Sequence, residues 1–550
     1  MHLSSKFFFL LPLFLSGFCY AQKPGKPAID FSHAGYGGGG KALPQVAAVL
    51  TIQPTGGDDT RLLQEAVNQI GKLPVQKNGF RGALLLPAKT FRIAGQLRLN
   101  KSGVVLRGSK KDSDSTRMIA TGIDRRTLIL AGADAVPVTD DSITVIDDIV
   151  LAGAYQLTLQ HTSGLKIGDR ITITRPSTKE WIQSVGMDTA KGAFANLRIH
   201  WWPRSRDLTW DRTIVAIDKA KNQITVDAPV TVAIEKKFGG ALVAKTTVNN
   251  VVNNIGIENL SLISEYNKSQ PKDEEHAWIG IQVENAEDVF IRNISAYHFV
   301  ASAVRVGHRG RRVTISNCRN LQPVSEVGGY RRQSFLVEGQ QVLVYNCFAE
   351  NGMNDFAAGL CSGGPNVFLN CSAKKALDWS GSFESWNAGV LYENVTIDGA
   401  GLKVDFDMAR SQGGGWTAAN SLLWNCKATS LIAGGHPSAP NENITSAAPL
   451  YAQQLKTRTG KELTALLRQP APTFQSVKTF VLPAGKPLPE ATELALQIVN
   501  GRFVIGNKTA WGGSVNDAWW MGQTSPSVAL DAGISITRFV PGRAGPGLTE

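Results

Sequence analysis

The chain has 550 residues and a formal net charge of +12, since 57 lysines and arginines outnumber 45 aspartates and glutamates. Charged residues form only 19% of the chain while glycine occurs 55 times, a composition that suits short strands and tight turns better than helices. No segment after the first 22 residues offers about 20 uninterrupted apolar residues, which excludes a later transmembrane helix. The charge mildly favours anionic partners, with a basic protein that has no anionic ligand as the alternative. No nucleic-acid partner is expected.

The first 21 residues have the pattern of a secretory signal peptide. Lys6 precedes an unbroken apolar run, and the small-residue exit Cys19-Tyr20-Ala21 predicts cleavage after Ala21. A lipid anchor at Cys19 is the alternative, but Phe18 precedes it, where lipidation signals need a small side chain. The sequence therefore predicts a secreted or periplasmic protein, which we expect to be a monomer.

Three N-terminal segments share a pattern with a known superfamily. They are DFSHAGYGGGG (Asp30–Gly40), GGDDTRLLQEAVNQI (Gly56–Ile70) and GALLLPAKTFRIAGQLRLNKSGVVLRGS (Gly82–Ser109). Together they resemble the opening of the pectate-lyase-like superfamily of right-handed parallel β-helix proteins, and the resemblance extends over roughly residues 28–430. It implies an N-terminal capping helix that begins at Asp-Asp-Thr and closes the first coil. It implies no particular reaction, because the superfamily includes lyases, hydrolases, epimerases and phage tailspikes.

A small β-rich insertion is expected at about residues 155–232, with turns at Gly168-Asp169 and at residues 218–222. Its aromatic and basic side chains are Trp181, Trp201, Trp202, Trp210, Arg204, Arg206 and Arg212. Two interpretations stay open. The tryptophans form one wall of a sugar cleft, or they pack the insertion onto the rest of the protein.

An asparagine followed by a small or apolar residue recurs along the middle of the chain. The asparagines are Asn259, Asn293, Asn317, Asn346, Asn370, Asn394 and Asn425, separated by 34, 24, 29, 24, 24 and 31 residues. A repeat of 24 residues with insertions is typical of a solenoid, and β-branched and aromatic runs before each asparagine indicate strands. An asparagine at each turn can hydrogen-bond to those above and below it. We predict an all-β, right-handed, single-stranded parallel β-helix over residues 22–432.

Five cysteines remain after signal cleavage: Cys318, Cys347, Cys361, Cys371 and Cys426. Four of them directly follow an asparagine of the repeat. This regularity predicts stacked, buried, reduced thiols rather than disulfides or a metal cage. Residues 433–550 contain a helical pattern and then a strand-rich end, which we expect to cap the open end of the β-helix.

Aligning the coils on the asparagines places polar residues of successive coils above one another. The candidate catalytic residues are Tyr330, Arg331, Asp355, Asp378 and His276, and the candidate substrate-binding residues are Arg305, Arg332, Glu384, Trp379 and His308. With a bend at this point, Arg331, Asp355 and Asp378 lie on successive coils about 5 Å apart. A titratable strip in a groove is where catalysis is expected. The alternative is an outward-facing ladder of Arg–Asp ion pairs.

Cleavage of a polysaccharide requires one of two arrangements of catalytic residues. β-Elimination from a uronate requires a base and a cation that neutralises the carboxylate. Tyr330 and His276 are the candidate bases, and Arg305, Arg331 and Arg332 the candidate neutralisers.

Hydrolysis requires two carboxylates instead, which Asp355, Asp378 and Glu384 can supply. The sequence favours a secreted polysaccharide lyase that cleaves an acidic, uronate-containing polysaccharide. A glycoside hydrolase and a non-catalytic glycan-binding or tailspike-like protein are the alternatives.

Two insertions in the repeat, NKSQPKDEEH (Asn267–His276) and SEVGGYRR (Ser325–Arg332), are expected to rise beside the strip. The carboxylates of Asp273, Glu274 and Glu275 form a candidate Ca²⁺ site with His276, although an acidic loop run is more often simply solvated. No metal or cofactor is otherwise expected.

Overall fold

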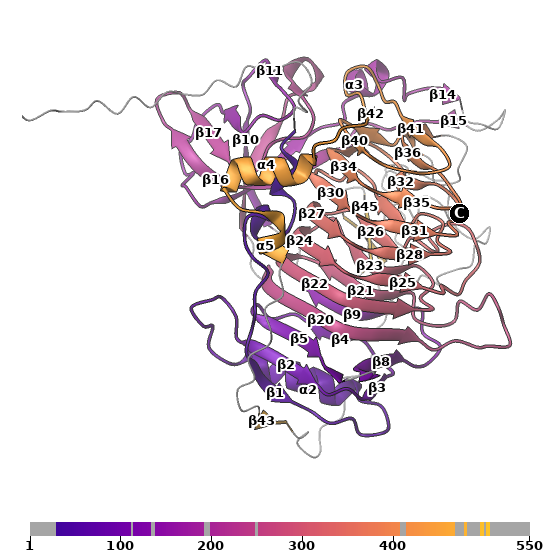
Figure 1. Cartoon of the computed structure of the whole chain (residues 1–550). Helices are drawn as coiled ribbons and strands as arrows, with labels where there is room; N and C mark the ends of the chain where they lie inside the picture. The colour runs from indigo at the N-terminus through magenta and orange to yellow at the C-terminus, as the bar shows by residue number, and fades with distance from the viewer. Residues whose placement is uncertain are drawn as a thin grey trace, which may run out of the picture.

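A computed structural model describes residues 29–111, 114–133, 138–191, 198–247, 251–407, 414–467, 478–480, 496–499 and 502–505. The predicted signal peptide lies outside these residues. The body of the protein is a parallel β-helix whose coils stack one above another (Figure 1), which confirms the predicted fold class. Among the described helices, none has the length and apolar character needed to cross a bilayer.

A sheet of nine parallel strands forms one face of the coils. Its strands are β4 (Leu97–Leu99), β9 (Thr127–Gly132), β21 (Ile279–Glu284), β23 (Ser302–Val306), β26 (Phe335–Val337), β29 (Phe356–Ala358), β32 (Ser380–Ser382), β36 (Leu402–Val404) and β41 (Leu431–Ala433). Each strand pairs in register with the strand of the next coil, so residues in one outward position stack in a row.

A larger sheet covers the rest of the coils. Before the asparagine turn it contains β1 (Ala48–Thr51), β2 (Gly82–Leu86), β5 (Val104–Gly108), β20 (Val252–Ser264), β22 (Ala286–Tyr297), β24 (Gly310–Ser316), β27 (Gln340–Tyr345), β30 (Asn366–Leu369), β34 (Val390–Glu393), β40 (Leu422–Trp424) and β42 (Glu442–Ile444). After the turn it contains β3 (Thr90–Ile93), β8 (Arg117–Ala120), β25 (Arg319–Leu321), β28 (Phe348–Glu350), β31 (Ser372–Lys374) and β35 (Thr396–Ile397). The early strands β20 and β22 run through the turn without interruption.

The predicted asparagine ladder is present. All seven asparagines have a left-handed backbone, with φ between 51° and 60°. The Nδ2 of Asn293 donates to Oδ1 of Asn259 at 2.7 Å, and Asn394 donates to Asn370 at 3.0 Å. The side chains of Asn370 and Asn394 are exposed, so the ladder runs along the outside of the turn rather than through a buried site.

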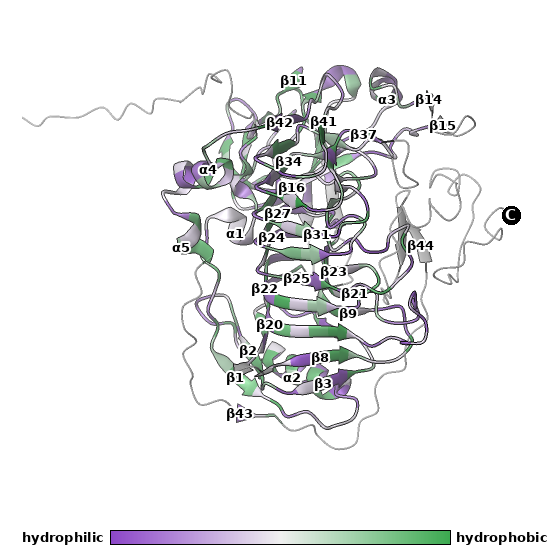
Figure 2. Ribbon diagram, turned by 45° about the vertical axis from the view of Figure 1, so that its right-hand side comes forward, coloured by the Kyte–Doolittle hydropathy of each residue, from purple (hydrophilic) through white to green (hydrophobic). Residues whose placement is uncertain are grey.

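The residues that follow the ladder asparagines point into the core, as predicted. Cys318, Cys347, Cys371 and Cys426 are buried and free, and Cys361 is also free. Burial raises the pKa of the Cys347 thiol, which keeps it protonated. These thiols act as small hydrophobic side chains in a continuous apolar column, whose alternation along the strands is visible in Figure 2.

Helix α2 (Thr60–Gly71) closes the first coil at the bottom of Figure 1, as the resemblance implied. One face of the helix, including Leu63 and Val67, packs into the core of the coils. The two aspartates before it fasten the helix start to the coil: Asp58 accepts the backbone N–H groups of Thr60 and Ala94, and Asp59 that of Arg92.

The insertion is wider than predicted and occupies the chain between β9 and β20. Its elements are β10 (Val138–Thr144), β11 (Ile149–Val150), β12 (Gln156–Thr158), β13 (Arg170–Arg175), α3 (Lys179–Ser184), β14 (Ala190–Lys191), β15 (Arg198–Ile199), β16 (Leu208–Asp218), β17 (Gln223–Val226), β18 (Ile234–Glu235), η2 (Lys236–Phe238) and β19 (Leu242–Thr247). The prediction of 155–232 was too narrow because β10 and β19, which lie outside it, pair with each other within the six-stranded sheet of the insertion.

The tryptophans of the insertion pack it onto the coils, which decides between the two interpretations. Trp181, Trp201 and Trp210 are buried, and the ring of Trp181 meets that of Trp386 from the coils at 4.9 Å in an edge-to-face contact. Trp202 is exposed.

Arg212 also ties the insertion to the coils. It is fully buried and donates to the carbonyls of Ala228, Pro229 and Gly364. These carbonyl partners compensate for the loss of hydration of the guanidinium.

In the C-terminal segment, two helices cover the side of the coils, while β42 extends the larger sheet beyond β40 at the last coil. Helices α4 (Leu450–Thr459) and α5 (Leu463–Leu467) pack with the N-terminal η1 (Phe31–His33) on strands of the larger sheet. Buried Glu393 accepts the N–H groups of Leu450 and Tyr451 at the start of α4. Farther on, β43 (Lys478–Thr479) pairs with β1 at the opposite end of the molecule. The remaining elements are α1 (Tyr36–Gly39), β6 (Lys110–Lys111), β7 (Asp114–Ser115), β33 (Asn387–Ala388), β37 (Phe406–Asp407), β38 (Gly415–Trp416), β39 (Ala418–Ala419), β44 (Leu496–Val499) and β45 (Arg502–Ile505).

The left-handed backbone of the ladder predicts the cost of removing an asparagine. Asn370→Ala should lower the free energy of unfolding by about 1–2 kcal/mol, because alanine disfavours the left-handed region. Asn370→Gly tolerates that backbone but removes the same amide, so it should lose less. Urea unfolding of the two variants measures the difference, and an alanine variant as stable as the parent would contradict a structural role of the ladder.

Candidate active site

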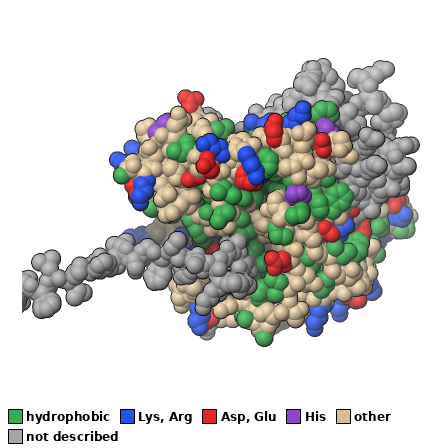
Figure 3. Space-filling model, turned by 90° about the horizontal axis from the view of Figure 1, so that it is seen from above, with side chains coloured by type: hydrophobic (Ala, Val, Ile, Leu, Met, Phe, Trp, Pro, Cys, Tyr) green, Lys and Arg blue, Asp and Glu red, His purple; other side chains and the backbone are tan. Residues whose placement is uncertain are grey.

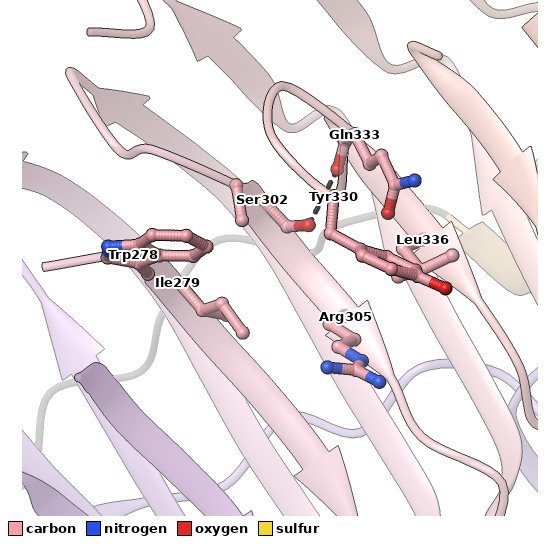
Figure 4. A pocket seen from close by; sticks show the side chains of 8 residues that line it. Trp278, Ile279, Ser302, Arg305, Tyr330, Gln333 and Leu336 are labelled. Atoms are coloured by element: carbon pink, nitrogen blue, oxygen red, sulfur yellow. Dashed lines mark hydrogen bonds between the residues drawn. The ribbon is translucent and has the colours of Figure 1, made fainter. Parts of the chain in front are cut away.

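A small hollow opens on the outer face of the nine-stranded sheet. Figure 4 shows the side chains that line it, which come from β21, β23 and β26 and from the loop before β26. They are Trp278, Ile279, Ala301, Ser302, Arg305, Tyr330, Gln333 and Leu336. Two of the predicted site residues, Tyr330 and Arg305, therefore line one hollow, and the guanidinium of Arg305 lies near the Tyr330 ring in Figure 4.

Tyr330 connects the hollow to a buried glutamate. Its hydroxyl donates to Oε1 of Glu384, and the backbone N–H of Leu360 donates to Oε2 of the same carboxylate at 3.2 Å. Glu384 is 4% exposed and has a left-handed backbone, with φ of 66°. Tyr330 also contacts Phe383 edge to face at 6.4 Å between ring centroids. The structure thus brings together Tyr330 and Glu384, which the sequence placed two coils apart.

Arg305 connects the hollow to a second glutamate, Glu338. Its Nε and Nη2 donate to the two carboxylate oxygens at 2.8 and 3.2 Å, a bidentate pair. The Nε2 of His308 lies 3.9 Å from Glu338 Oε1. Glu338 is only 2% exposed, so this ion pair is removed from water. Glu338 was not among the residues predicted from the sequence.

Glu338 belongs to a row of outward positions that follow the strands of the nine-stranded sheet. The register aligns Glu284, Gly307, Glu338, Gly359, Phe383, Asp405 and Gly434. A Cβ at Gly359 would lie 3.0 Å from Glu338 Cγ and 3.3 Å from Phe383, so glycine leaves room for the glutamate above it. Glu384 accepts the N–H of Leu360, so both glutamates border the Gly359-Leu360 segment. The sequence signal was a Glu, Asp or Gly at six of these seven aligned positions, with Phe383 as the exception.

Arg331 lies beside the hollow but is engaged elsewhere. Its Nε and Nη2 donate to Glu274 at 2.6 and 2.8 Å, and its guanidinium lies 5.3 Å from the Trp278 ring centroid. Although burial raises it, the pKa of Glu274 is held below its usual value by Arg331. The two insertions in the repeat contact each other through this pair. Arg331 does not pair with Asp355, which corrects the predicted Arg–Asp stack.

Two predicted catalytic residues are buried inside the protein, which is a correction to the predicted strip. His276 is 0% exposed, and its ring nitrogens lie 2.7 Å from Ser264 Oγ and 3.1 Å from the Asp273 carbonyl. Asp355 is also 0% exposed and accepts from Ser334 Oγ at 2.7 Å. Neither residue lines the hollow.

The remaining predicted residues lie outside the hollow. Arg332 donates to the Ser325 hydroxyl and carbonyl, which hold the loop before β26 in shape. Half-buried Asp378 accepts the N–H of the next residue, Trp379, whose ring packs over Gly401. Glu338 and Glu384 bond to residues that line the hollow, whereas Asp355 and Asp378 bond to Ser334 and to the Trp379 backbone.

The three carboxylates of the candidate Ca²⁺ site bind separate partners in the structure. Asp273 accepts the backbone N–H groups of Asn267 and Glu275, while Glu274 pairs with Arg331 and Glu275 with Arg125. Across the described ranges, no group of three His, Cys, Asp or Glu side chains is arranged to hold a metal. The run therefore fastens loops through separate contacts.

Comparison with known proteins identifies a family only at the C-terminal end. Residues 468–550 match a family described as a domain of unknown function, DUF6298. No curated protein matches the chain.

Three solved structures are similar to this chain, each with low sequence identity and a low TM-score. The tailspike protein gp49 from Pseudomonas phage LKA1 has 13% identity and a TM-score of 0.32, with 68% of this chain and 64% of the tailspike covered. The surface adhesin PfbA of Streptococcus pneumoniae has 10% identity and a TM-score of 0.37, with 74% and 75% covered. The GH82 iota-carrageenase from A. fortis has 11% identity and a TM-score of 0.31, with 66% and 57% covered. The chain spans less than two thirds of the tailspike and of the carrageenase, and these values transfer no activity to it.

Burial of Asp355 predicts that stability depends on pH. Burial raises the pKa of Asp355 from 3.8 to about 7, so between these values the folded protein holds a proton that the unfolded chain has released. The free energy of unfolding should fall by on the order of 4 kcal/mol as pH rises from about 4 to about 7, and this contribution is then constant.

Asp355→Asn is neutral throughout this range and should remove that fall. Urea unfolding of both proteins at about pH 4.5, 6 and 8 tests the difference. Equal pH dependence in the two proteins would contradict a buried, titrating Asp355.

Proposed function

We infer that this protein is an exported carbohydrate-active enzyme that hydrolyses a glycosidic bond, with Glu338 and Glu384 as its carboxylate pair. The observation that carries the proposal is that each of the two ionisable residues lining the hollow, Arg305 and Tyr330, is bonded to one of these nearly buried glutamates. Glycoside hydrolysis requires a pair of carboxylic side chains, one on each side of the scissile bond.

The surroundings of the two glutamates suggest different roles. Glu338 faces the permanent positive charge of Arg305, which favours its ionised form, so it acts as base or nucleophile. Glu384 accepts hydrogen bonds from two neutral donors, the Tyr330 hydroxyl and the Leu360 N–H. It is therefore the easier of the two to protonate and acts as the general acid toward the leaving oxygen.

β-Elimination of an acidic glycan is the competing reaction, and it is supported by the Tyr330 hydroxyl close to a guanidinium and by the net charge of +12. Elimination needs a cation free to neutralise a uronate. Arg305 and Arg331 are already paired with Glu338 and Glu274. On the end of the molecule that Figure 3 views from above, basic and acidic side chains also lie interspersed. Because the arginines beside the hollow are paired with glutamates, hydrolysis of a glycan without a strong negative charge is favoured over elimination.

Replacing the glutamates tests the hydrolase. Glu384→Gln and Glu338→Gln should each reduce turnover by about 10² to 10⁴, since each removes a proton-transfer or nucleophilic group. Tyr330→Phe should reduce it less, because it removes one hydrogen bond to Glu384. New reducing ends on a panel of neutral and anionic glycans report hydrolysis, and absorbance of an unsaturated uronate reports elimination.

Glu326→Gln is a matched control. Glu326 is an exposed glutamate on the loop that carries Tyr330, and it pairs with Lys272. It should leave both activity and thermal unfolding unchanged. Unsaturated uronate formation by the parent would identify the lyase instead. Full activity of both Glu338 and Glu384 variants would place the active site elsewhere, and glycan binding without any product would indicate a binding protein.

A further inference from the structure

One tryptophan of the insertion is not used to pack the insertion onto the coils. Trp202 is 40% exposed, whereas every other tryptophan in the described part of the chain is buried or partly buried. Its ring meets that of partly buried His200 edge to face, with 4.5 Å between the ring centroids. The two rings form a small aromatic platform directly after β15, which we call the Trp202 platform. Aromatic rings placed in this way offer a flat apolar surface to a ligand.

The backbone that presents Trp202 is held firmly. Residues 202–205 form a turn of the type II pattern, with proline in its second position and a left-handed third residue, Arg204, at a φ of 69°. The N–H and the hydroxyl of Ser205 both donate to the Trp202 carbonyl, at 3.0 and 2.6 Å. The Nε of Arg204 donates to Asp207 at 2.7 Å. Because the turn is already ordered, a ligand that contacts the platform loses little affinity to the ordering of this backbone.

Hydrogen bonds connect the platform to the segment that carries Glu384. The indole N–H of Trp201 donates to the Gly414 carbonyl at 2.7 Å, and the Gly414 N–H donates to the Glu384 carbonyl at 3.0 Å. The Trp201 ring also meets that of Trp386, two residues after Glu384, edge to face at 6.2 Å. Trp201 therefore anchors this part of the insertion beside Glu384, and the next residue, Trp202, stays exposed.

The platform lies toward the later coils as seen from the hollow. Figures 1 and 2 both show β15 at the end of the molecule where the last coils lie. The strand β26 beside the hollow and the strand β32 before Glu384 belong to coils two apart, so about 10 Å of sheet separates them. A ligand that reaches from the hollow past Glu384 to the platform is therefore longer than one sugar ring.

We propose that the Trp202 platform is a stacking subsite for a sugar residue remote from the bond that is cleaved. This assignment rests on the proposed function and specifies its substrate as a glycan chain of several sugar residues. The C–H face of a sugar ring packs on the exposed indole, where burial of apolar surface and dispersion stabilise it. The Asp188 carbonyl contacts Nδ1 of His200, which fixes the orientation of the second ring.

Affinity electrophoresis tests the subsite with xyloglucan, galactomannan, laminarin and polygalacturonate as probes. At least one of them should retard the parent protein, and Trp202→Ala should weaken that binding about tenfold. Trp202→Phe, which keeps an aromatic face, should retain most of it. Thermal unfolding should be unchanged, because the side chain is exposed. Failure of all four polysaccharides to retard the parent, or equal retardation of parent and Trp202→Ala, would overturn the proposal.

Ile167→Ala is the matched control, since Ile167 is a 67% exposed apolar side chain on the same insertion. It should bind the polysaccharide like the parent. An equal loss of binding in this control would show a general effect of exposed apolar surface and would overturn the stacking role of Trp202.

Chain length separates a remote subsite from the cleavage site. Isothermal titration with oligosaccharides of the retarding polysaccharide that contain two, four and six sugar residues should show affinity rising with length in the parent. In Trp202→Ala the gain for the longest chain should be lost, while affinity for the disaccharide stays the same. An equal loss of affinity for the disaccharide would contradict a subsite remote from the cleaved bond.

The outcome for the subsite is separate from that for the hydrolase. If Trp202→Ala loses binding but the Glu338 and Glu384 variants keep full activity, the subsite stands and the hydrolase assignment fails. If those glutamate variants lose activity while Trp202→Ala binds like the parent, the hydrolase stands and the subsite fails. Light scattering that finds a dimer in the parent and a monomer in Trp202→Ala would assign the platform to a contact between copies of the chain and overturn the proposal.

Discussion

The in-register stacking of parallel coils is the constraint on which the rest of this structure depends. Each coil turns at an asparagine with a left-handed backbone, and the repeated turn brings every strand back above its predecessor. Because β-strands of neighbouring coils are about 4.8 Å apart, any outward position becomes a row of side chains at that spacing. The row that contains Glu338 and Gly359 arises in this way, with a glycine in the coil next to each of Glu284, Glu338 and Asp405.

A stack of coils leaves open ends and exposed sides, and the chain covers them with segments distant in sequence. Helix α2 closes the first coil, and β43 pairs with the outer edge of β1. The insertion is held by buried tryptophans and by Arg212, whose hydrogen bonds to carbonyls cross from the insertion to the coils. Such contacts oppose fraying of a solenoid, since each coil otherwise touches only its neighbours.

Charge compensation gives the candidate site its chemical character. Arg305 and Arg331 are each bound by two hydrogen bonds to a glutamate of low exposure, and these pairs hold the loops around the hollow. Because each arginine charge is balanced by a glutamate, the site attracts a polyanion only weakly. In a region of low dielectric the same ion pairs hold the carboxylates in fixed orientations.

The sequence alone determined the repeat, and with it much of the architecture. The spacing of Asn317, Asn346 and Asn370 predicted coils, the turn conformation and the buried cysteines, because these depend on local backbone preferences and on an alternation of side chains that recurs in every coil. It also brought Tyr330, Arg305 and Glu384 into the set of candidate residues. Only the tertiary structure decided which of them meet. Counting along the repeat assumes a regular pleat, but loops of different length interrupt it, Asp355 and His276 are buried, and Glu384 lies beside Leu360. Pairings such as Arg331 with Glu274, and Arg305 with Glu338, join different coils, so they follow from packing in three dimensions rather than from spacing along the chain.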